Sequence, residues 1–408
     1  MSRDTVLVFG GGGAKSHVAD WSARLREEAD RRELSVEVAD EPANLVGLLG
    51  KPDPVAVWPV DYRNVAQACR LARERQAETK LRAVLGFREF SLFATAAAAA
   101  EVGLPWNSPA SIARIRRKDR CRRHLAAHGF SQPELHLFDS ADEAQRFIGG
   151  RGSPAIVKPV DSFGSQGVCL VRPGEDATAP VQHAFTHSPS ILVEDFIDGL
   201  PCSAEGIIVN GEPMILALTV KSIIKPPYFA TVSNSLPAPF TPAEAASIHE
   251  QVAAAVACVD LTHSLFHVEF FWTDGGIVLG EMHARPGGDW IHAMVAHHRP
   301  GLELFGLVLD DLLGMASGVP SVSDAAPAAA SLAILSPSGV VTRVSGEEDA
   351  RTMPDCLAVD VFVRPGDPVE PVRDSFQRAA LVVASGCDVA SAQALATVVA
   401  QKIQIQVG

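Results

Sequence analysis

The sequence lacks several features that would assign it to a specialised class of protein. Its seven cysteines are scattered and odd in number, and none is spaced C-x-x-C, a pattern that favours reduced thiols over disulfides or a zinc site. No basic and apolar leader precedes the first strand-like run, and the longest small-apolar run, residues 95–100, is too short to cross a membrane. These absences predict a cytoplasmic protein without a membrane-spanning segment.

Basic residues are also too few to suggest a nucleic-acid partner. Lys and Arg total 35 against 48 Asp and Glu, which gives a net charge of -13. An acidic chain without a basic stripe argues against nucleic-acid binding, although a local basic pocket can still hold a nucleotide. The basic segment 111–129 predicts a helix with a solvated charged face. With 408 residues, the chain is long enough for two or three domains.

Residues 5–107 alternate strand-like and helix-like runs, which is typical of an open α/β domain around a parallel sheet. The strand-like runs lie at residues 6–9, 36–38, 54–58 and 83–86. Four glycines, residues 10–13, follow the first run, but the dinucleotide fingerprint G-x-G-x-x-G needs a third glycine where Lys15 or Ser16 stands. Asp40 is only a weak candidate for a ribose contact. We therefore interpret the glycines as a turn, and an NAD-dependent enzyme is the weakest alternative.

The middle of the chain contains strand-like runs with turns between them. Residues 155–171 predict two short strands joined by a glycine-rich loop, and residues 191–197 predict a strand that ends in an acidic hinge. Strand-like runs at 266–272 and 276–282 flank the turn at Asp274 and Gly275, which predicts a β-hairpin. A linker at 317–328 leads into a mostly β segment that one helix, residues 389–400, closes.

Lys158 ends one of these strands beside a flexible loop of glycine and serine. A fixed positive charge next to free backbone N–H groups suits the oxygens of a polyphosphate. The segment is not a Walker loop, which needs G-K-[ST] at the start of a helix. A glycine-rich hairpin without a ligand is the alternative interpretation.

The acidic hinge that follows could face an adenine ring. A strand of this kind presents alternating backbone C=O and N–H groups to the adenine edge, and a carboxylate can accept from the exocyclic amine or the ribose hydroxyls. Solvated acids at a strand end are the alternative interpretation. The candidates are Glu194, Asp195, Phe196, Ile197 and, further on, Glu205.

Glu269 and Glu281 lie on the two arms of the predicted hairpin, where such residues can face each other across the strand pair. Two opposed carboxylates repel unless a cation lies between them, and Mg²⁺ is bound through a few carboxylates and substrate phosphates. Arg285, four residues after Glu281, can reach the same pocket and clamp a carboxylate or a transferring phosphoryl group. A surface Arg–Glu pair is the alternative.

This order of features resembles the ATP-grasp superfamily, and within it the carboxylate–amine ligase branch that includes L-amino-acid ligases and carnosine synthase. Residues 95–130 resemble the segment that leads into the family's lid. The resemblance implies that ATP is bound by Lys118, Lys158, Ser162, Gly164, Ser165, Gln166, Gly167, Glu194, Asp195, Phe196, Ile197 and Glu205. It further implies that Glu269 and Glu281 hold one or two Mg²⁺ ions, with Arg285 and Lys158 as the catalytic residues. The substrate contacts that it implies are Arg285, Gly288, Asp289, Asn234, Thr231 and His267.

Three positions depart from the family pattern. Many relatives carry Asn where this chain has His283, and imidazole binds Mg²⁺ poorly, so His283 is either a metal ligand or a contact to phosphate or substrate. Dipeptide-forming relatives often place Glu and His where this chain has Thr231 and Asn234, and both changes remove charge from the expected substrate pocket. They argue against an ordinary L-amino acid as the first substrate. Asp289 is then available to receive an ammonium or hydroxyl group.

We therefore predict an α/β protein with an α+β grasp in three parts. An N-terminal α/β domain covers residues 1–110, an ATP-grasp domain with a mobile lid at about 125–190 covers 111–315, and a small, mostly β domain covers 316–408. The predicted substrates are ATP, a small carboxylate and a small amine, and the predicted products are an amide or peptide, ADP and phosphate, formed through an acyl phosphate.

Alternatives to this prediction are another ATP-grasp enzyme, such as a carboxylase or a phosphoryl-transfer enzyme, and a non-catalytic nucleotide-binding module. The sequence leaves the oligomeric state open, a homodimer included. His292, His297 and His298 follow the expected site and are predicted to lie on a helix surface.

Overall fold

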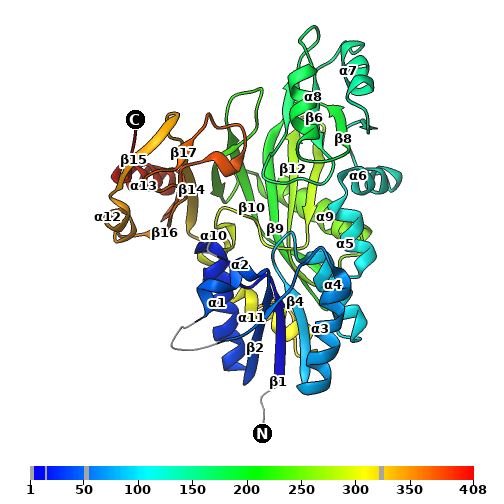
Figure 1. The fold of residues 1–408 in the computed structure, drawn as a ribbon, viewed down its shortest axis with the longest axis vertical. Helices are drawn as coiled ribbons and strands as arrows, with labels where there is room; N and C mark the ends of the chain where they lie inside the picture. Colours follow the sequence, from blue (N-terminus) through cyan, green and yellow to red (C-terminus); the bar gives the residue numbers. More distant parts are fainter. Residues whose placement is uncertain (1–3, 14–15, 50–54, 321–325) are drawn as a thin grey trace.

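The computed structural model describes residues 4–13, 16–49, 55–320 and 326–408. Pro54 of one predicted strand, Lys15 of the glycine segment and residues 321–325 of the predicted linker lie outside these ranges. Figure 1 shows the N-terminal part at the bottom, a tall central sheet above it, a lid at the top and the C-terminal part at the left.

The N-terminal part is an open α/β domain, as predicted. Its four parallel strands are arranged in the order β3-β2-β1-β4. The strands are β1 Asp4–Phe9, β2 Leu34–Asp40, β3 Ala56–Pro59 and β4 Leu81–Gly86. The helices are α1 Ser16–Arg31, α2 Pro42–Leu45, η1 Val46–Leu48, α3 Val65–Glu78 and α4 Leu92–Glu101.

The glycine segment after β1 folds back on Asp40 at the end of β2. The backbone N–H of Gly12 donates to the Asp40 carboxylate at 2.9 Å, and a Cβ on Gly12 would lie 2.7 Å from the backbone oxygen of Asn44. Asp40 is fully buried and also accepts from the Asn44 amide at 2.8 Å. The Asp40 carboxylate is thus already engaged by hydrogen bonds within the domain. This geometry supports the interpretation of the four glycines as a structural turn.

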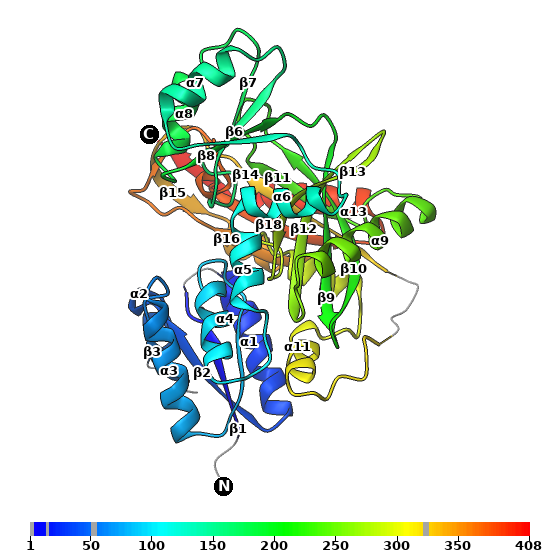
Figure 2. The same ribbon diagram turned by 90° about the vertical axis from the view of Figure 1, so that its right-hand side faces the viewer.

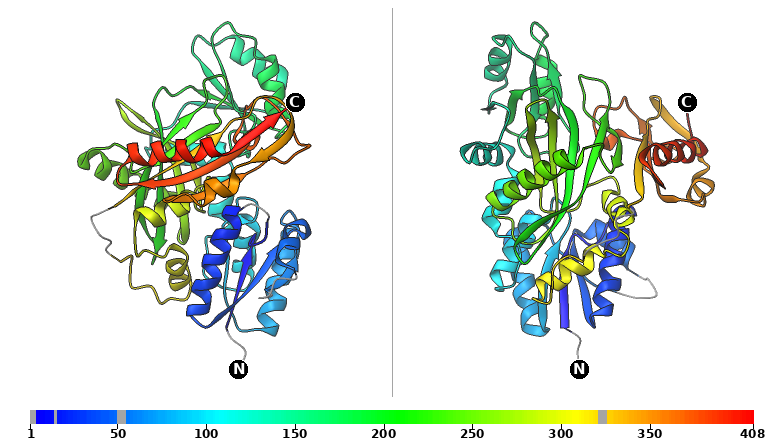
Figure 3. Two further views of the ribbon diagram at one scale, coloured as in Figure 1. Left: turned by 90° about the vertical axis from the view of Figure 1, so that its left-hand side faces the viewer. Right: turned by 180° about the vertical axis from the view of Figure 1, so that it is seen from behind.

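The central sheet has eight strands in the order β13-β12-β9-β10-β11-β14-β18-β16. The strands from the middle of the chain are β9 Leu200–Val209, β10 Glu212–Ile223, β11 Thr231–Leu236, β12 Ser264–Thr273 and β13 Gly276–His283. The pair β12–β13 confirms the predicted hairpin. Helix α9 Pro242–Cys258 packs on β10, and α11 Leu304–Leu312 packs on α1 and β9. Figure 3 shows α11, in yellow, between the N-terminal domain and the central sheet.

The C-terminal part continues the central sheet instead of forming a sheet entirely of its own. Three of its strands, β14 Ala328–Ile334, β16 Cys356–Val361 and β18 Ala380–Gly386, extend the sheet beyond β11. Three more, β15 Gly339–Ser345, β17 Pro368–Val369 and β19 Gln404–Val407, form a small separate sheet. Helices α12 Glu347–Arg351 and α13 Val389–Lys402 and the short η2 Ser375–Gln377 complete it. The closing helix lies where the sequence predicted it.

The lid is a four-stranded antiparallel sheet that carries two helices. The strands, in the order β5-β8-β6-β7, are β5 Leu135–Phe138, β8 Ile191–Asp195, β6 Ala155–Pro159 and β7 Cys169–Val171. The helices are α7 Ala141–Gly149 and α8 Thr178–Phe185. The lid has a hydrophobic core of its own, which includes Ile148, Val157 and Val193. Figure 2 shows it standing apart above the rest of the molecule, as a separately packed unit would.

The N-terminal and central parts share one hydrophobic core. Phe87, just after β4, has its ring centroid 5.3 Å from Trp21 of α1 and 5.4 Å from Phe305 of α11. Burial of such aromatic contacts favours a fixed arrangement of the two parts. Among the described residues, every helix is too short or too polar to span a lipid bilayer.

Two predictions about helix surfaces were wrong in part. The basic segment forms two helices, α5 Pro109–Arg116 and α6 Lys118–Ala127, and Lys118 and Arg122 of α6 are buried because they face the lid and the central sheet. In α10 Ile291–His298, both His292 and His298 are buried, since the helix lies between the central sheet and α1. His292 contacts Asp20 of α1 at 2.9 Å.

Candidate active site

A cavity of about 1320 Å³ lies where the lid, the central sheet, the N-terminal domain and the C-terminal part meet. Sixteen of the predicted site residues line it: Lys158, Gly164, Ser165, Glu194, Asp195, Phe196, Ile197, Thr231, Asn234, His267, Glu269, Glu281, His283, Arg285, Gly288 and Asp289. Lys118 and Ser162 line a small adjoining pocket that shares Glu281 and His283 with it. Of the described candidates, Gln166, Gly167 and Glu205 lie off the cavity wall.

Glu269 and Glu281 meet at a β-bulge in the hairpin. Val268 pairs with Met282 and Phe270 pairs with Leu279, so Glu269 stands opposite two residues, Gly280 and Glu281. A bulge of this kind re-aims side chains locally. Gly280 is needed there, because a Cβ would lie 2.9 Å from the backbone oxygen of Glu269. Direct one-to-one opposition of the glutamates was predicted, and the bulge replaces it while keeping both carboxylates at the cavity.

Each of these carboxylates has a lysine partner. Lys221 of β10 forms an ion pair with Glu269, and Lys118 lies 3.5 Å from Glu281. Burial alone would raise the pKa of Glu269, but the charge of Lys221 together with the hydrogen bond and charge of His267 outweighs burial and holds that pKa well below its ordinary range. Both glutamates therefore lie where a cation is favoured. Lys221 was not predicted, because nothing in the sequence of β10 distinguishes it from a solvated strand lysine.

The predicted phosphate lysine, Lys158, is held by the predicted adenine-side acid. Its Nζ lies 2.7 Å from Glu194, and Arg122 of α6 contacts the other oxygen of Glu194 at 2.7 Å. Burial alone would raise the pKa of Glu194, but the charges of Arg122 and Lys158 outweigh it and lower that pKa. Arg122 also donates to the backbone oxygen of Leu279 at 2.9 Å and so joins lid to hairpin. The Glu194 carboxylate is thus engaged by two cations.

The glycine and serine loop after β6 packs against two other parts of the chain. A Cβ on Gly164 would lie 2.6 Å from the ring of Phe376, and the φ of +65° at Gly164 also favours glycine. The ring of Phe163 lies 4.9 Å from Phe90 and 5.5 Å from Phe376. The Ser165 hydroxyl donates to the backbone oxygen of Phe229 at 3.0 Å. The loop is therefore seated between the N-terminal and C-terminal parts, over the cavity.

Glu89, from the loop after β4, holds Arg285 and His283 together. Its carboxylate accepts from Arg285 Nε at 2.7 Å and lies 2.9 Å from His283 Nδ1. Burial and the neighbouring charge of Arg285 lower the pKa of His283, so the imidazole is uncharged at neutral pH. With Nδ1 engaged by Glu89, His283 presents Nε2 towards Glu281, 3.6 Å away. That leaves His283 able to contact a metal or a phosphate, the two roles predicted for it.

Asp289 is paired with Arg378 of the C-terminal part. Arg378 donates to both carboxylate oxygens, at 2.7 and 2.6 Å, and also to the backbone oxygen of Thr231 at 3.2 Å. Asn234 is buried beside this pair and donates to the Ser331 hydroxyl at 3.1 Å. Asp289 was predicted to receive a substrate ammonium or hydroxyl group, but its carboxylate already has a bidentate cationic partner.

His267 links Glu205, which lies off the cavity wall, to Glu269, the predicted metal ligand. It pairs with Glu205 across β12 and β9, and its Nδ1 lies 2.8 Å from the Glu205 carboxylate. Its other nitrogen lies 3.3 Å from Glu269. Burial alone would lower the pKa of His267, but the charge of Glu205 and the hydrogen bonds to Glu205 and Glu269 together outweigh burial and raise that pKa. Glu205, which was predicted to contact ATP, is thus placed to orient His267.

Two of these partners were missed because they are distant in sequence. Glu89 follows the carboxyl end of a parallel strand, the edge where ligands bind in open α/β sheets, and that position was a usable signal. Arg378 lies between η2 and β18, in a segment without any recognisable motif.

Two family models match the chain. Residues 151–294 match an ATP-grasp domain, and residues 333–408 match the second C-terminal domain of L-amino acid ligases. These matches confirm the predicted resemblance. The chain therefore contains an ATP-grasp domain and a C-terminal domain of the L-amino acid ligase type, which supports an ATP-dependent ligase.

Similar proteins agree with these models. The structure of L-amino acid ligase from Bacillus licheniformis superposes with a TM-score of 0.82 over 100% of both chains, at 21% identity. The protein y4rH of Sinorhizobium fredii is 29% identical over 69% of this chain and 59% of its own length. Human carnosine synthase 1 is 24% identical over 61% of this chain and 32% of its own length. The chain therefore spans between about a third and three fifths of these two curated relatives.

Proposed function

We propose that this chain, which combines an ATP-grasp domain with an L-amino acid ligase C-terminal domain, activates a small carboxylic acid with ATP and joins it to an amine. The observation that carries the proposal is the meeting of cationic and acidic side chains around one cavity. Lys118 and Lys158 supply positive charge on the lid side, Glu269 and Glu281 supply paired carboxylates, and Arg285 points to the same space.

The two glutamates fit a magnesium site. Both are carboxylates at the cavity, and each lies beside a lysine, so positive charge is already favoured at both positions, which supports a cation site there. Hard oxygen ligands of this kind suit Mg²⁺, and His283 Nε2 faces the same group. When bound by Glu269 and Glu281, one or two Mg²⁺ ions would neutralise charge on the ATP phosphates.

The reaction has two steps. An oxygen of the substrate carboxylate attacks the γ-phosphorus, the bond to the β–γ bridging oxygen breaks, and ADP leaves behind an acyl phosphate. The amine nitrogen then attacks the acyl carbon, the carbon–oxygen bond to phosphate breaks, and the amine loses a proton. Lys118 and Lys158 hold the phosphates, and Arg285, oriented by Glu89, stabilises the charge that develops during transfer.

The lid loop protects the intermediate. An acyl phosphate hydrolyses if water reaches it, so the cavity must close during the reaction. The Phe163 ring, packed between Phe90 and Phe376, seats the loop over the cavity. We place the reaction in the cytoplasm, where ATP is available and where the free cysteines would stay reduced.

The substrate side favours an acid without an α-ammonium group at the Asp289 position. Thr231 and Asn234 carry no charge, and Arg378 already neutralises Asp289. An incoming ammonium would have to compete with a buried bidentate ion pair, which is costly to break. Simple or hydroxylated carboxylic acids meet no such competition.

The test is a product analysis with Mg-ATP, a pooled set of amines, and matched sets of acids with and without an α-amino group. We expect ADP and phosphate only when an acid and an amine are both present, with faster turnover for acids that lack the amino group. Glu281→Gln should abolish turnover, and Glu250→Gln, on the exposed face of α9, should not. AMP and pyrophosphate as products would contradict the acyl phosphate, and a preference for the matched amino acids would contradict only the substrate class.

A further inference from the structure

A cluster of nitrogen and sulfur ligands lies outside the cavity wall, where two helices end side by side. His124 is in the last turn of α6, His128 follows the end of the same helix, and Cys258 is the last residue of α9. One potential ligand atom from each side chain lies within 4.8 Å of the other two. The spacing of the cysteines along the chain argued against a zinc site. This cluster could not be seen in the sequence, because residues 124 and 258 are brought together only by the fold.

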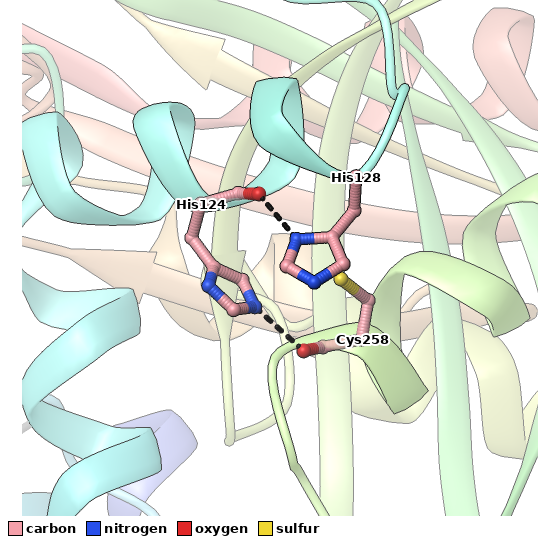
Figure 4. Close-up of side chains that lie close together, drawn as sticks. All are labelled: His124, His128 and Cys258. Atoms are coloured by element: carbon pink, nitrogen blue, oxygen red, sulfur yellow. Dashed lines mark hydrogen bonds between the residues drawn. The ribbon is translucent and has the colours of Figure 1, made fainter.

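Backbone hydrogen bonds orient the rings of this cluster (Figure 4). His128 Nδ1 lies 2.8 Å from the backbone oxygen of His124, an acceptor that requires a proton on Nδ1 and leaves Nε2 with a free lone pair. Figure 4 shows that second nitrogen turned towards the Cys258 sulfur. A backbone carbonyl that fixes the tautomer of a histidine in this way is a common outer partner of a metal ligand.

His124 has a different partner in the free protein. Its Nε2 lies 2.8 Å from the backbone oxygen of Cys258. Tetrahedral Zn²⁺ with nitrogen at about 2.0 Å and sulfur at about 2.3 Å needs ligand atoms roughly 3.3–3.6 Å apart. The ligand atoms lie within 4.8 Å of one another, so they must draw together by at most about 1.5 Å to form such a site, and ligation through His124 Nε2 would replace its hydrogen bond to the carbonyl. His128 is exposed and the other two residues are half-buried, so a metal ion can reach them from solvent.

We propose that His124, His128 and Cys258 bind a divalent transition metal of the Zn²⁺ class, with water as a fourth ligand. Two imidazoles and a thiolate suit Zn²⁺ and Co²⁺ and do not suit Mg²⁺, which prefers oxygen. The carboxyl ends of α6 and α9 both point here, and the negative ends of their dipoles favour a cation.

Such a metal would tie α6 to α9. Helix α6 begins at Lys118 and carries Arg122, whose guanidinium holds Glu194 of the lid. Besides the His124 contact to the Cys258 backbone, Arg114 of the neighbouring α5 donates to the backbone oxygen of Val259, just after α9, at 2.8 Å. A metal at the other end of α6 would fix the helix at both ends and steady the base of the lid. The site is thus structural or regulatory, and separate from the Mg²⁺ that the cavity carboxylates would hold.

The experiment is a Co²⁺ titration of the full chain, with excess Mg²⁺ present to occupy carboxylate sites. Thiolate ligation gives Co²⁺ a charge-transfer band in the near ultraviolet, and tetrahedral geometry gives strong visible bands. We expect one Co²⁺ per chain with both signatures, and we expect Zn²⁺ to displace it. Cys258→Ser should lose the charge-transfer band, and Cys387→Ser, the matched control at an exposed cysteine, should keep it.

His128→Ala provides a second variant that should fold normally, because His128 is exposed. We expect it to weaken Co²⁺ binding by at least about tenfold. Glu281→Gln should leave both signatures unchanged. A charge-transfer band that survives Cys258→Ser, or no band in the unmodified chain at one equivalent of Co²⁺, would overturn the proposal.

Discussion

The two sides of the cavity are built in different ways. On the phosphate side, the key residues come from helix α6, the lid and the hairpin of one continuous stretch of chain: Lys118, Lys158, Glu194, Glu269 and Glu281. On the substrate side, the key side chains are held from outside that stretch, Arg285 by Glu89 and Asp289 by Arg378. The residues of the phosphate side therefore follow one another within one stretch of sequence. The geometry of the substrate side depends instead on how the N-terminal, central and C-terminal parts pack together.

This difference separates chemistry from selectivity. In the proposed function, the phosphate side would bind ATP, a reactant that is common to all ATP-grasp enzymes. The substrate side can change when a docked residue such as Arg378 changes, without any effect on the hairpin glutamates. The predictions below test each side in turn.

The largest effect is expected on the phosphate side. Glu269→Gln keeps a hydrogen-bond partner for Lys221 but removes one of the two paired carboxylates, and we expect kcat to fall by about 10³-fold. ADP release measures it. A loss smaller than tenfold would mean that Glu269 takes no part in the reaction.

Arg378→Met tests the docked C-terminal part. It leaves the half-buried Asp289 without its cation, and loss of one partner of such a pair costs up to about 3–5 kcal/mol in the free energy of unfolding, the value for a fully buried pair. Urea unfolding, followed with hydrogen exchange in β14 and β18, measures the loss. The control is Arg351→Met, whose exposed pair with Glu347 should be worth at most about 1 kcal/mol. Equal losses in the two variants would refute the role of the Asp289–Arg378 pair.

Glu89→Gln tests the docked N-terminal part. Glu89 is a positioning residue, so its loss should misplace Arg285 and lower kcat by about 10²-fold while the KM for ATP stays nearly unchanged. Glu89→Asp should recover part of the activity, and Glu101→Gln, in an exposed pair with Arg73, should have no effect. A rise in the KM for ATP with kcat intact would place Glu89 on the phosphate side instead.

The smallest effect concerns pH. Burial alone would raise the pKa of Asp289, but the charge and hydrogen bonds of Arg378 and the charge of Lys221 together outweigh burial and lower that pKa in the folded chain. The pair therefore stabilises the fold fully above the unfolded pKa of about 3.9, and this contribution is lost as pH falls through the lower folded pKa. Urea midpoints should fall more steeply with acid in the unmodified chain than in Asp289→Asn. Parallel slopes would show that Asp289 is not stabilised by Arg378.

Much of the fold and the phosphate side could be predicted from the sequence. The hairpin turn at Asp274 and Gly275 placed Glu269 and Glu281 correctly, because alternation and turn chemistry are local signals. The bulge at Gly280 was not predicted, since its cause is close packing against the Glu269 backbone. Arg122 was assigned to a solvated face, because a run of basic residues does not show which of them pairs with a buried carboxylate. In the structure, Arg122 pairs with Glu194.

The substrate side of the cavity could not be predicted from local sequence signals. Glu89 and Arg285 are separated by nearly two hundred positions, and their contact exists only because the N-terminal domain docks on the hairpin. Asp289 looked free in the sequence because its partner, Arg378, lies in a segment with no motif. Pairing of buried charges is a property of the tertiary structure, and such pairs are the part that sequence patterns leave out.

The most direct test of the central claim follows oxygen from the acid. The chain is incubated with Mg-ATP, an amine pool and carboxylic acids labelled with ¹⁸O in the carboxylate, and the products are analysed by mass spectrometry. An acyl phosphate intermediate predicts phosphate that carries one ¹⁸O atom, together with unlabelled ADP. Transfer of ¹⁸O to AMP, or unlabelled phosphate alongside a newly formed amide, would contradict it.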